Sequence, residues 1–401
     1  MSTIAPTKHR VEVLDVIRGF AIFGIIIANI QSWSGYKFIP FEVLETLNFY
    51  DYNSLIKYFF NFFVDTKFYT LFSLLFGIGF YLQFAKQKEN QAVFIPTYRR
   101  RLGFLILFGA IHSFFWSGDI LMIYALVGFV FILFRNFKEK TMLLLSIIFY
   151  YVWLLYDLFF ALYLPDFMSV ASQAYKTYPD ISPQALTAIF QNGTFYEVLQ
   201  VNWHNLYYRY IDLIPTGRLT KLLALFLLGY YLMSINYFKT YAKSRKLFLF
   251  LLIFGLYLEY LALQIGGSMS TFSSNLNNVL YKFTASTAQL FLALSYISIL
   301  VIMYEKNWGQ KLLKPFTYVG KMSFTNYLLQ TFFGFLLFYP YFGGYFGSMG
   351  LLEITLLALG FYILQVVFSM LWLRFFAFGP LEWVWRCLTY KKLFPIKKIV
   401  K

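Results

Sequence analysis

The feature that most constrains this chain is a series of long apolar runs, each able to cross a lipid bilayer. A spanning helix needs about 17–25 mostly apolar residues, because it rises 1.5 Å per residue through a hydrocarbon core ~30 Å thick. Within that core every backbone amide must be bonded inside the protein, and a helix achieves this within one segment. The sequence therefore predicts an all-α polytopic integral membrane protein with about ten transmembrane helices, at roughly 12–32, 58–85, 102–117, 119–134, 141–163, 219–238, 247–268, 279–303, 315–339 and 351–378.

Composition favours the same assignment. The chain is 60% hydrophobic and 13% charged, whereas a soluble domain carries about 25% charged residues. The single cysteine, Cys387, excludes an internal disulfide. Because the sequence has only three histidines, a His-rich metal site is not expected and no metal is predicted.

The net charge of +16 is explained by where the basic residues lie. With the N-terminus inside, the inner connections hold most of the Lys and Arg residues, including Arg99, Arg100 and Arg101. The outer segments hold only Lys37, Lys57, Lys176, Arg209 and Arg218. Cytoplasmic loops of membrane proteins carry such an excess. The sequence thus predicts cytoplasmic termini, a cell-membrane location with the lipid bilayer as partner, and no nucleic-acid binding.

The whole chain, 1–401, is interpreted as a single membrane domain, because it shows no internal repeat and no low-complexity stretch. Its one long connection, 164–218, lies between the fifth and sixth predicted spans and is expected to be extracytoplasmic. Its mixed polar and apolar character predicts amphipathic helices on the membrane surface. The third and fourth runs are short and share the turn Ser117-Gly118, so they are expected to form a helical hairpin.

Polar residues near the outer ends of the first four spans form the first candidate site. They are Asn29, Asp65, His112 and Asp119, together with Lys67, which is an alternative to Asn29 as the group that stabilises an oxyanion. Burial of an ionisable group in a span costs at least ~2.5–3.5 kcal/mol, so such groups usually face a cavity or a partner. We expect the first four to share a cavity in which His112 is a general base oriented by Asp119 or Asp65. The alternative is that His112 is an interface histidine whose hydrogen bonds are satisfied by neighbouring helices.

A second group of polar residues lies toward the inner ends of the spans. Asp15 and Arg18 are three residues apart, on one face of the first helix, and form either a structural ion pair or part of a ligand site. The cluster Arg99, Arg100 and Arg101 either anchors the topology or binds phosphates. The ninth predicted span, 315–339, has Lys321 in its inner half and carries Asn326 on a polar stripe with Ser323 and Gln330.

Several motifs resemble the YeiB-like membrane family, a family without an assigned function. They are spread in order over most of the chain, at Val13–Ile25 with Asn29, Lys67–Gly79, His112–Leu126, Gly320–Tyr327 and Gly379–Trp383. That family resembles a wider group of transmembrane acyltransferases, which includes heparan-α-glucosaminide N-acetyltransferase and bacterial polysaccharide O-acyltransferases. Members take an acyl group from acyl-CoA on the cytoplasmic side and deliver it to a glycan on the far side.

The resemblance implies roles for individual residues. The pattern Leu-Asp-x-x-Arg-Gly at Asp15, Arg18 and Gly19 is shared with the acyltransferases. Eleven residues after this arginine the O-acyltransferases have a histidine, where this chain has Asn29. If acyl transfer occurs here, His112 is expected to replace that histidine as the base.

The leading hypothesis is therefore acyl transfer across the membrane from acetyl-CoA or another acyl-CoA to a glycan or similar acceptor. The catalytic residues would be His112, Asp119, Asp65 and Asn29, and the donor would be held by Asp15, Arg18, Arg99, Arg100, Arg101, Lys321 and Asn326. The alternative is a transporter or lipid-handling protein that performs no chemistry, with its inner and outer polar clusters acting as gates. The acceptor, the acyl length and the oligomeric state, including a homo-oligomer, are left open.

Overall fold

The computed structural model describes residues 12–164, 182–214, 216–267, 269 and 275–398. Within these ranges the chain forms helices and no strand, with one isolated bridge between Phe376 and Lys397. The all-α prediction is confirmed. The helices are α1 (Glu12–Trp33), α2 (Phe41–Leu44), α3 (Asn53–Phe63), α4 (Lys67–Ala85), α5 (Gln91–Phe115), α6 (Leu121–Phe131), α7 (Glu139–Tyr151), α8 (Trp153–Tyr163), α10 (Pro183–Asn192), α11 (Phe195–Ile211), α12 (Arg218–Ser234), α13 (Tyr237–Thr240), α14 (Arg245–Ile265), α15 (Leu276–Tyr304), α16 (Asn307–Lys321), α17 (Ser323–Phe338), α18 (Leu351–Phe375) and α19 (Pro380–Tyr390), with short turns η1 (Tyr36–Phe38), η2 (Tyr50–Tyr52), η3 (Lys88–Asn90) and η4 (Ile132–Phe134).

Six helical stretches in the described chain are long and apolar enough to cross a membrane. They are Glu12–Trp33, Tyr50–Ala85, Glu139–Tyr163, Arg245–Ile265, Leu276–Tyr304 and Leu351–Phe375. The remaining predicted spans correspond to α5, which carries the arginine cluster, and to the shorter apolar helices α6, α12 and α17. A multi-pass membrane protein is supported, while the count of ten and the orientation stay predictions.

Several of the predicted spans are broken by short interruptions. The run 58–85 is divided between α3 and α4, where Thr66 has a φ of 66°. The run 141–163 is divided at Val152, and the run 315–339 is divided at Met322. At this last break the Glu382 carboxylate accepts hydrogen bonds from the backbone N–H groups of Phe324 (2.7 Å) and Thr325 (3.1 Å). The first backbone N–H groups of α17 are thus bonded by Glu382, which lies outside the predicted span 315–339 and could not be identified from that span alone.

Helix α1 lies at the centre of the bundle, and 72% of the residues in its apolar 18-residue stretch are buried. It crosses α16 through two glycines. A Cβ on Gly320 would lie 1.8 Å from the backbone oxygen of Asp15, and one on Gly19 would lie 1.9 Å from that of Phe316. Gly77 on α4 and Gly229 on α12 pack in the same way. Helices in membranes associate closely through such small residues.

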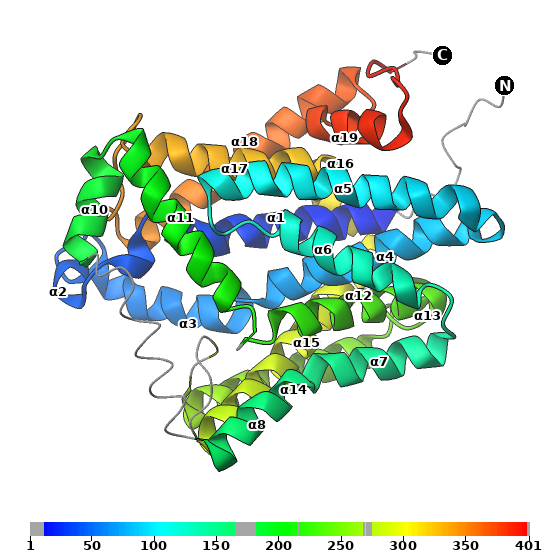
Figure 1. The fold of residues 1–401 in the computed structure, drawn as a ribbon, viewed down its shortest axis with the longest axis horizontal. Coiled ribbons are helices and arrows are strands. Elements are labelled where there is room, and N and C mark those ends of the chain that lie inside the picture. The colour runs from blue at the N-terminus through cyan, green and yellow to red at the C-terminus, as the bar shows by residue number, and fades with distance from the viewer. Residues whose placement is uncertain (1–11, 165–181, 215, 268, 270–274, 399–401) are drawn as a thin grey trace.

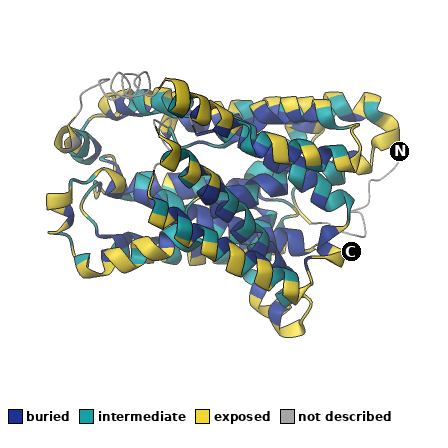
Figure 2. Ribbon diagram, turned by 90° about the horizontal axis from the view of Figure 1, so that it is seen from below, coloured by how far each residue is buried: buried dark blue, intermediate teal, exposed yellow. Residues whose placement is uncertain are grey.

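The outer helices expose apolar side chains. In the most apolar stretches of α14 and α18 only 22% and 28% of the residues are buried, and large residues such as Ile253, Tyr257, Ile363 and Leu364 are exposed. Figure 2 shows exposed residues along the helices at the outside of the bundle. Contiguous apolar surface of this extent is unfavourable on a monomer in water, whereas it is favourable in contact with lipid. In the long direction of the bundle, α2 and α10 lie at one end and α19 toward the other (Figure 1). We refer to these as the α10 end and the α19 end.

Candidate functional site

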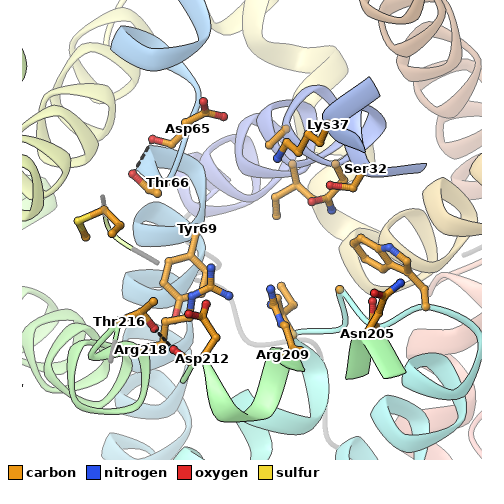
Figure 3. Close-up of a pocket in the computed structure, with 18 of the residues that line it drawn as sticks. Ser32, Lys37, Asp65, Thr66, Tyr69, Asn205, Arg209, Asp212, Thr216 and Arg218 are labelled. Atoms are coloured by element: carbon orange, nitrogen blue, oxygen red, sulfur yellow. Dashed lines mark hydrogen bonds between the residues drawn. The ribbon is translucent and has the colours of Figure 1, made fainter. Parts of the chain in front are cut away.

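A cavity of about 550 Å³ opens at the α10 end between α1, α4, the α5–α6 turn, α11 and α12 (Figure 3). Sites for small organic ligands have volumes of this order. The polar residues of its lining are Asn29, Ser32, Lys37, Asp65, Thr66, Tyr69, Thr70, Ser117, Asn202, Asn205, Tyr208, Arg209, Asp212, Thr216, Arg218, Lys221 and Gln289. Two of the predicted outer residues, Asn29 and Asp65, therefore do face one cavity.

Basic residues outnumber acidic ones in this cavity. Lys37, Arg209, Arg218 and Lys221 line it, against only Asp65 and Asp212. Among the described residues, none of the four basic side chains forms an ion pair with a carboxylate.

Burial and the like charge of Arg218 lower the pKa of Arg209 to about 10, although Tyr327, Tyr69 and Asp119 oppose the shift. The pKa of Asp212 is raised by burial, and the charges of Arg218 and Arg209 oppose that shift. In both groups burial disfavours the charged form, and the favourable interactions with neighbouring groups do not fully offset this cost.

His112 lies behind the wall of the cavity, and it is not among the lining residues. Its Nδ1 is 2.7 Å from Oδ1 of Asp119, and its Nε2 is 2.9 Å from Oγ1 of Thr331 on α17. Asp119 also accepts a hydrogen bond from the backbone N–H of Met122 (2.9 Å), at the start of α6. The hydrogen bond expected between His112 and a carboxylate is present, and the three side chains form a hydroxyl–imidazole–carboxylate chain.

The wall between His112 and the cavity is thin. Trp116 lines the cavity and its indole lies edge-on to the His112 ring, with centroids 5.6 Å apart. Ser117, Gly118 and Ile120, which flank Asp119 in the sequence, also line the cavity. The imidazole is thus one residue layer from the space that holds Asn29 and Asp65.

The helix α11 is fixed to this wall by Asn202. The Asn202 side chain accepts a hydrogen bond from the backbone N–H of Ser117 (2.7 Å) and donates to the backbone oxygens of Phe114 (2.7 Å) and Ser113 (3.1 Å). These groups include carbonyls at the end of α5 that have no partner within the helix. Asn202 therefore positions Arg209, two turns later on the same face of α11, over the cavity.

Two ion pairs hold other intramembrane charges. The Lys67 ammonium is 3.0 Å from the Glu259 carboxylate, and the Lys282 ammonium is 2.9 Å from that of Asp157. Lys282 and Asp157 are almost completely buried. Paired in this way, the four residues join α4 to α14 and α8 to α15.

The inner candidate residues lie toward the α19 end and are divided among several environments. Arg18 binds Asp15 at 3.1 Å and keeps 28% of its side chain exposed. Arg100 donates to the backbone oxygen of Thr389 (2.8 Å), and the Arg101 guanidinium lies 3.7 Å from the centre of the Trp385 ring. Both arginines therefore dock α19 onto α5.

The other inner residues differ in exposure. Arg99 is exposed and Lys321 is half-buried. Asn326 is fully buried and donates to Ser369 Oγ at 2.9 Å. It belongs to a network with Gln330 and Gln365, whose side chains bond each other at 3.0 Å. This network joins α17 to α18, and the structure does not place Asn326 at the surface with Arg99.

Sequence reasoning missed the basic lining of the cavity. Arg209 and Arg218 were interpreted only as outer-segment charges, and Lys221 and Asp212 were not considered. One signal was available: Arg218 and Lys221 are three apart at the start of a predicted span, where the helix dipole disfavours cations. In the part of the chain that the structure describes, no group of three His, Cys, Asp or Glu side chains is placed to hold a metal ion.

Comparison with known proteins gives the family. Residues 232–392 match the family described as "Protein of unknown function (DUF418)". The chain is 34% identical to the "Uncharacterized protein YxaH" of Bacillus subtilis over the full length of both proteins. It is 29% identical to an "Uncharacterized 39.9 kDa protein in amylase 3'region" of Bacillus acidopullulyticus, covering 97% of this chain and 96% of that protein. It is 26% identical to the "Uncharacterized protein YeiB" of Escherichia coli, covering 96% and 98%.

No solved structure matches. The identity to YxaH over whole chains, together with the match to the family itself, shows the relationship that the motifs indicated. The chain belongs to the DUF418 family of YeiB-like proteins.

Proposed function

We propose that this protein is a transmembrane acyltransferase that moves an acyl group from cytoplasmic acyl-CoA to an acceptor in the cavity at the α10 end. The observation that carries the proposal is the Thr331–His112–Asp119 chain one residue layer behind a ligand-sized polar cavity. A base held by a carboxylate and bonded to a hydroxyl is the arrangement that activates an oxygen nucleophile.

The hydrogen bonds assign the protons of this chain. An ionised carboxylate only accepts, so Asp119 holds the proton on Nδ1 of His112 and leaves the Nε2 lone pair to the hydroxyl of Thr331. The acceptor hydroxyl or amine takes the place of Thr331 at Nε2. His112 removes a proton from the acceptor as the acceptor attacks the thioester carbonyl. His112 then delivers that proton to the departing CoA thiolate. Asn29 is the cavity amide that stabilises the oxyanion.

The donor is assigned to the α19 end. Arg99 is exposed, Lys321 is half-buried, and Arg18 keeps 28% of its side chain exposed beside Asp15, so the phosphates of CoA can reach all three cations. Asp15 orients Arg18. Arg18 and Asn29 are eleven residues apart on α1, which separates them by ~16 Å along the helix. The extended arm of CoA carries the thioester over that distance.

The test is acyl transfer in membranes that contain the overproduced protein, since such membranes also supply the acceptor. Radiolabelled acetyl-CoA should label a membrane component above the level of membranes without the protein. His112→Ala and Asp119→Asn should abolish the labelling. The first variant removes the base, and the second removes the carboxylate that keeps the proton on Nδ1 of His112. His204→Ala is the matched control, since His204 lies on α11, its Nδ1 is 2.8 Å from the backbone oxygen of Gln200 in the same helix, and it does not line the cavity. Equal labelling by the His112 variant and the wild type would refute the assignment.

A second function, transport or lipid handling without chemistry, is favoured by one observation. The lining of the cavity does not include His112, whose two ring nitrogens are both bonded within the bundle. In that case acetyl-CoA would leave the melting temperature unchanged, and labelling would not exceed the background.

A further inference from the structure

We propose that the cavity at the α10 end binds the phosphate group of a larger organic ligand. Lys37, Arg209, Arg218 and Lys221 approach the space from three elements, η1, α11 and α12. Figure 3 shows Lys37, Arg209 and Arg218 around one open space. Phosphate is recognised by convergent arginines and lysines, which donate several hydrogen bonds to its oxygens.

The basic side chains of the cavity are incompletely partnered. Lys221 is 8% exposed, and it has a contact with the face of Trp153 at 4.3 Å but, among the described residues, no ion pair. Nε of Arg209 is buried and has no hydrogen-bond partner in the described chain. A buried cation without a counter-charge is costly, so proteins pair such groups. An anionic ligand would supply the missing charge.

The start of α12 strengthens the site. Gly217 precedes this helix with a φ of 61°, and no side chain caps the first turn. Arg218 is the first residue of α12, and no acidic residue lies in the first turn. The N-terminus of a helix attracts anions through its dipole and its free N–H groups. A cation there is unfavourable unless an anion sits between it and the helix.

The other residues of the lining indicate the chemistry of the part of the ligand beyond its phosphate. Apolar side chains such as Phe68, Phe190, Leu225 and Phe346 share the cavity with the basic residues. Its volume of about 550 Å³ exceeds what phosphate alone would fill. Asp65 and Asp212 offer carboxylates that can accept hydrogen bonds from ligand hydroxyls. The ligand class is therefore a phosphate ester that carries hydroxyl groups. That this ester is the acyl acceptor rests on the proposed function, whereas its binding does not.

Binding can be tested without acyl-CoA, so the result is separate from any test of acyl transfer. The full-length protein in detergent is titrated with glycerol 3-phosphate, and its melting temperature and dissociation constant are measured at constant ionic strength. In a second arm, the protein in phosphatidylcholine nanodiscs is compared with nanodiscs that contain phosphatidylglycerol, whose headgroup carries a phosphate and two hydroxyls. Binding in the first arm identifies a soluble ester, and stabilisation only in the second identifies a lipid headgroup. Either result supports the site.

Variants locate the binding. Arg209→Gln with Arg218→Gln should weaken the affinity at least about 10-fold, because two charge-assisted hydrogen bonds are lost. Lys57→Gln is the matched control, since Lys57 is an exposed cation on α3 that lies near Tyr36 and does not line the cavity. Lys221→Met is the second variant should the double variant fail to fold. The proposal is overturned if no phosphate ester binds, or if Lys57→Gln and the cavity variants lose affinity equally.

Discussion

Two lysines near the ring of Trp153 lie in different environments. Lys282 on α15 lies 5.6 Å from the centre of the Trp153 ring, is completely buried and bonds Asp157 at 2.9 Å. Lys221 on α12 lies 4.3 Å from the same ring, is 8% exposed and has no ion pair in the described chain. The first lysine is compensated within the protein, and the second faces the cavity.

The paired lysine is expected to have a structural role, whereas the lysine at the cavity is expected to act in ligand binding. A charge paired within the bundle contributes to joining two helices, and its removal leaves a buried partner unpaired. A charge that faces a cavity without a partner lowers stability in the empty protein and is useful only when a ligand binds. Stability and ligand affinity should therefore respond in opposite ways in the two places.

The largest effect is expected at the paired lysine. Lys282→Met leaves the Asp157 carboxylate buried without its counter-charge and should lower the free energy of unfolding by about 3–5 kcal/mol. The measurement is thermal or denaturant unfolding of the purified protein in detergent. Combining the change with Asp157→Leu should restore most of the lost stability, because both charges are then removed. A Lys282→Met protein as stable as the wild type would show that the pair has no structural role.

The next effect concerns the link between α11 and the α5–α6 hairpin. Asn202→Ala leaves the backbone groups of Ser117 and Phe114 without their side-chain partner and should cost about 1–3 kcal/mol. Because α11 carries Arg209, affinity for the anionic ligand should also fall. Both are measurable on one sample, by unfolding and by titration with glycerol 3-phosphate. Gln200→Ala is the control, since Gln200 lies exposed on the same helix and does not line the cavity.

Local patterns allowed much of this molecule to be predicted. The apolar runs predict the helices, because lipid demands internal backbone bonding along each segment. The His112–Asp119 hydrogen bond was expected from seven residues of separation across one tight turn. Family membership followed from motifs spread along the chain.

Contacts between distant segments could not be predicted in this way. Thr331 reaches His112 across 219 residues, and Lys282 reaches Asp157 across 125. Many polar residues could partner each of these groups, and only the packing of the helices selects one. The same holds for Arg209, whose place over the cavity depends on Asn202 and on the hairpin that Asn202 binds. Part of the long connection, 165–181, lies outside the described residues.

A smaller effect is expected at the cavity lysine. Lys221→Met removes a nearly buried charge that has no ion pair among the described residues, so the unfolding free energy should stay within about 1 kcal/mol of the wild type or rise. Affinity for glycerol 3-phosphate should fall. Lys221→Met and Lys282→Met thus form a matched pair with opposite expectations for stability. If both destabilise equally, the contrast between the two lysines is wrong and Lys221 is structural.

The smallest effect concerns the carboxylate that opposes an anion in the cavity. Burial raises the pKa of Asp212, and the charges of Arg218 and Arg209 oppose that shift. Asp65, Lys37 and Lys221 also face the same space. Above its raised pKa the Asp212 carboxylate is ionised and repels an anion. Asp212→Asn should therefore tighten the binding of sulfate by about 3- to 10-fold, the size expected for one charge several ångströms away.

The pH dependence of this gain has a definite sign. As the pH falls through the raised pKa, Asp212 in the wild type becomes neutral, and the two proteins should converge in affinity. Sulfate is the suitable probe because its own charge does not change over this range, unlike that of phosphate. Burial, the main cause of the raised pKa, disfavours the ionised carboxylate, so the Asn variant should be the more stable protein above that pKa, by a margin that also shrinks on acidification. A gain in sulfate affinity that persists unchanged at low pH would mean that Asp212 acts through the shape of the cavity and not through its charge.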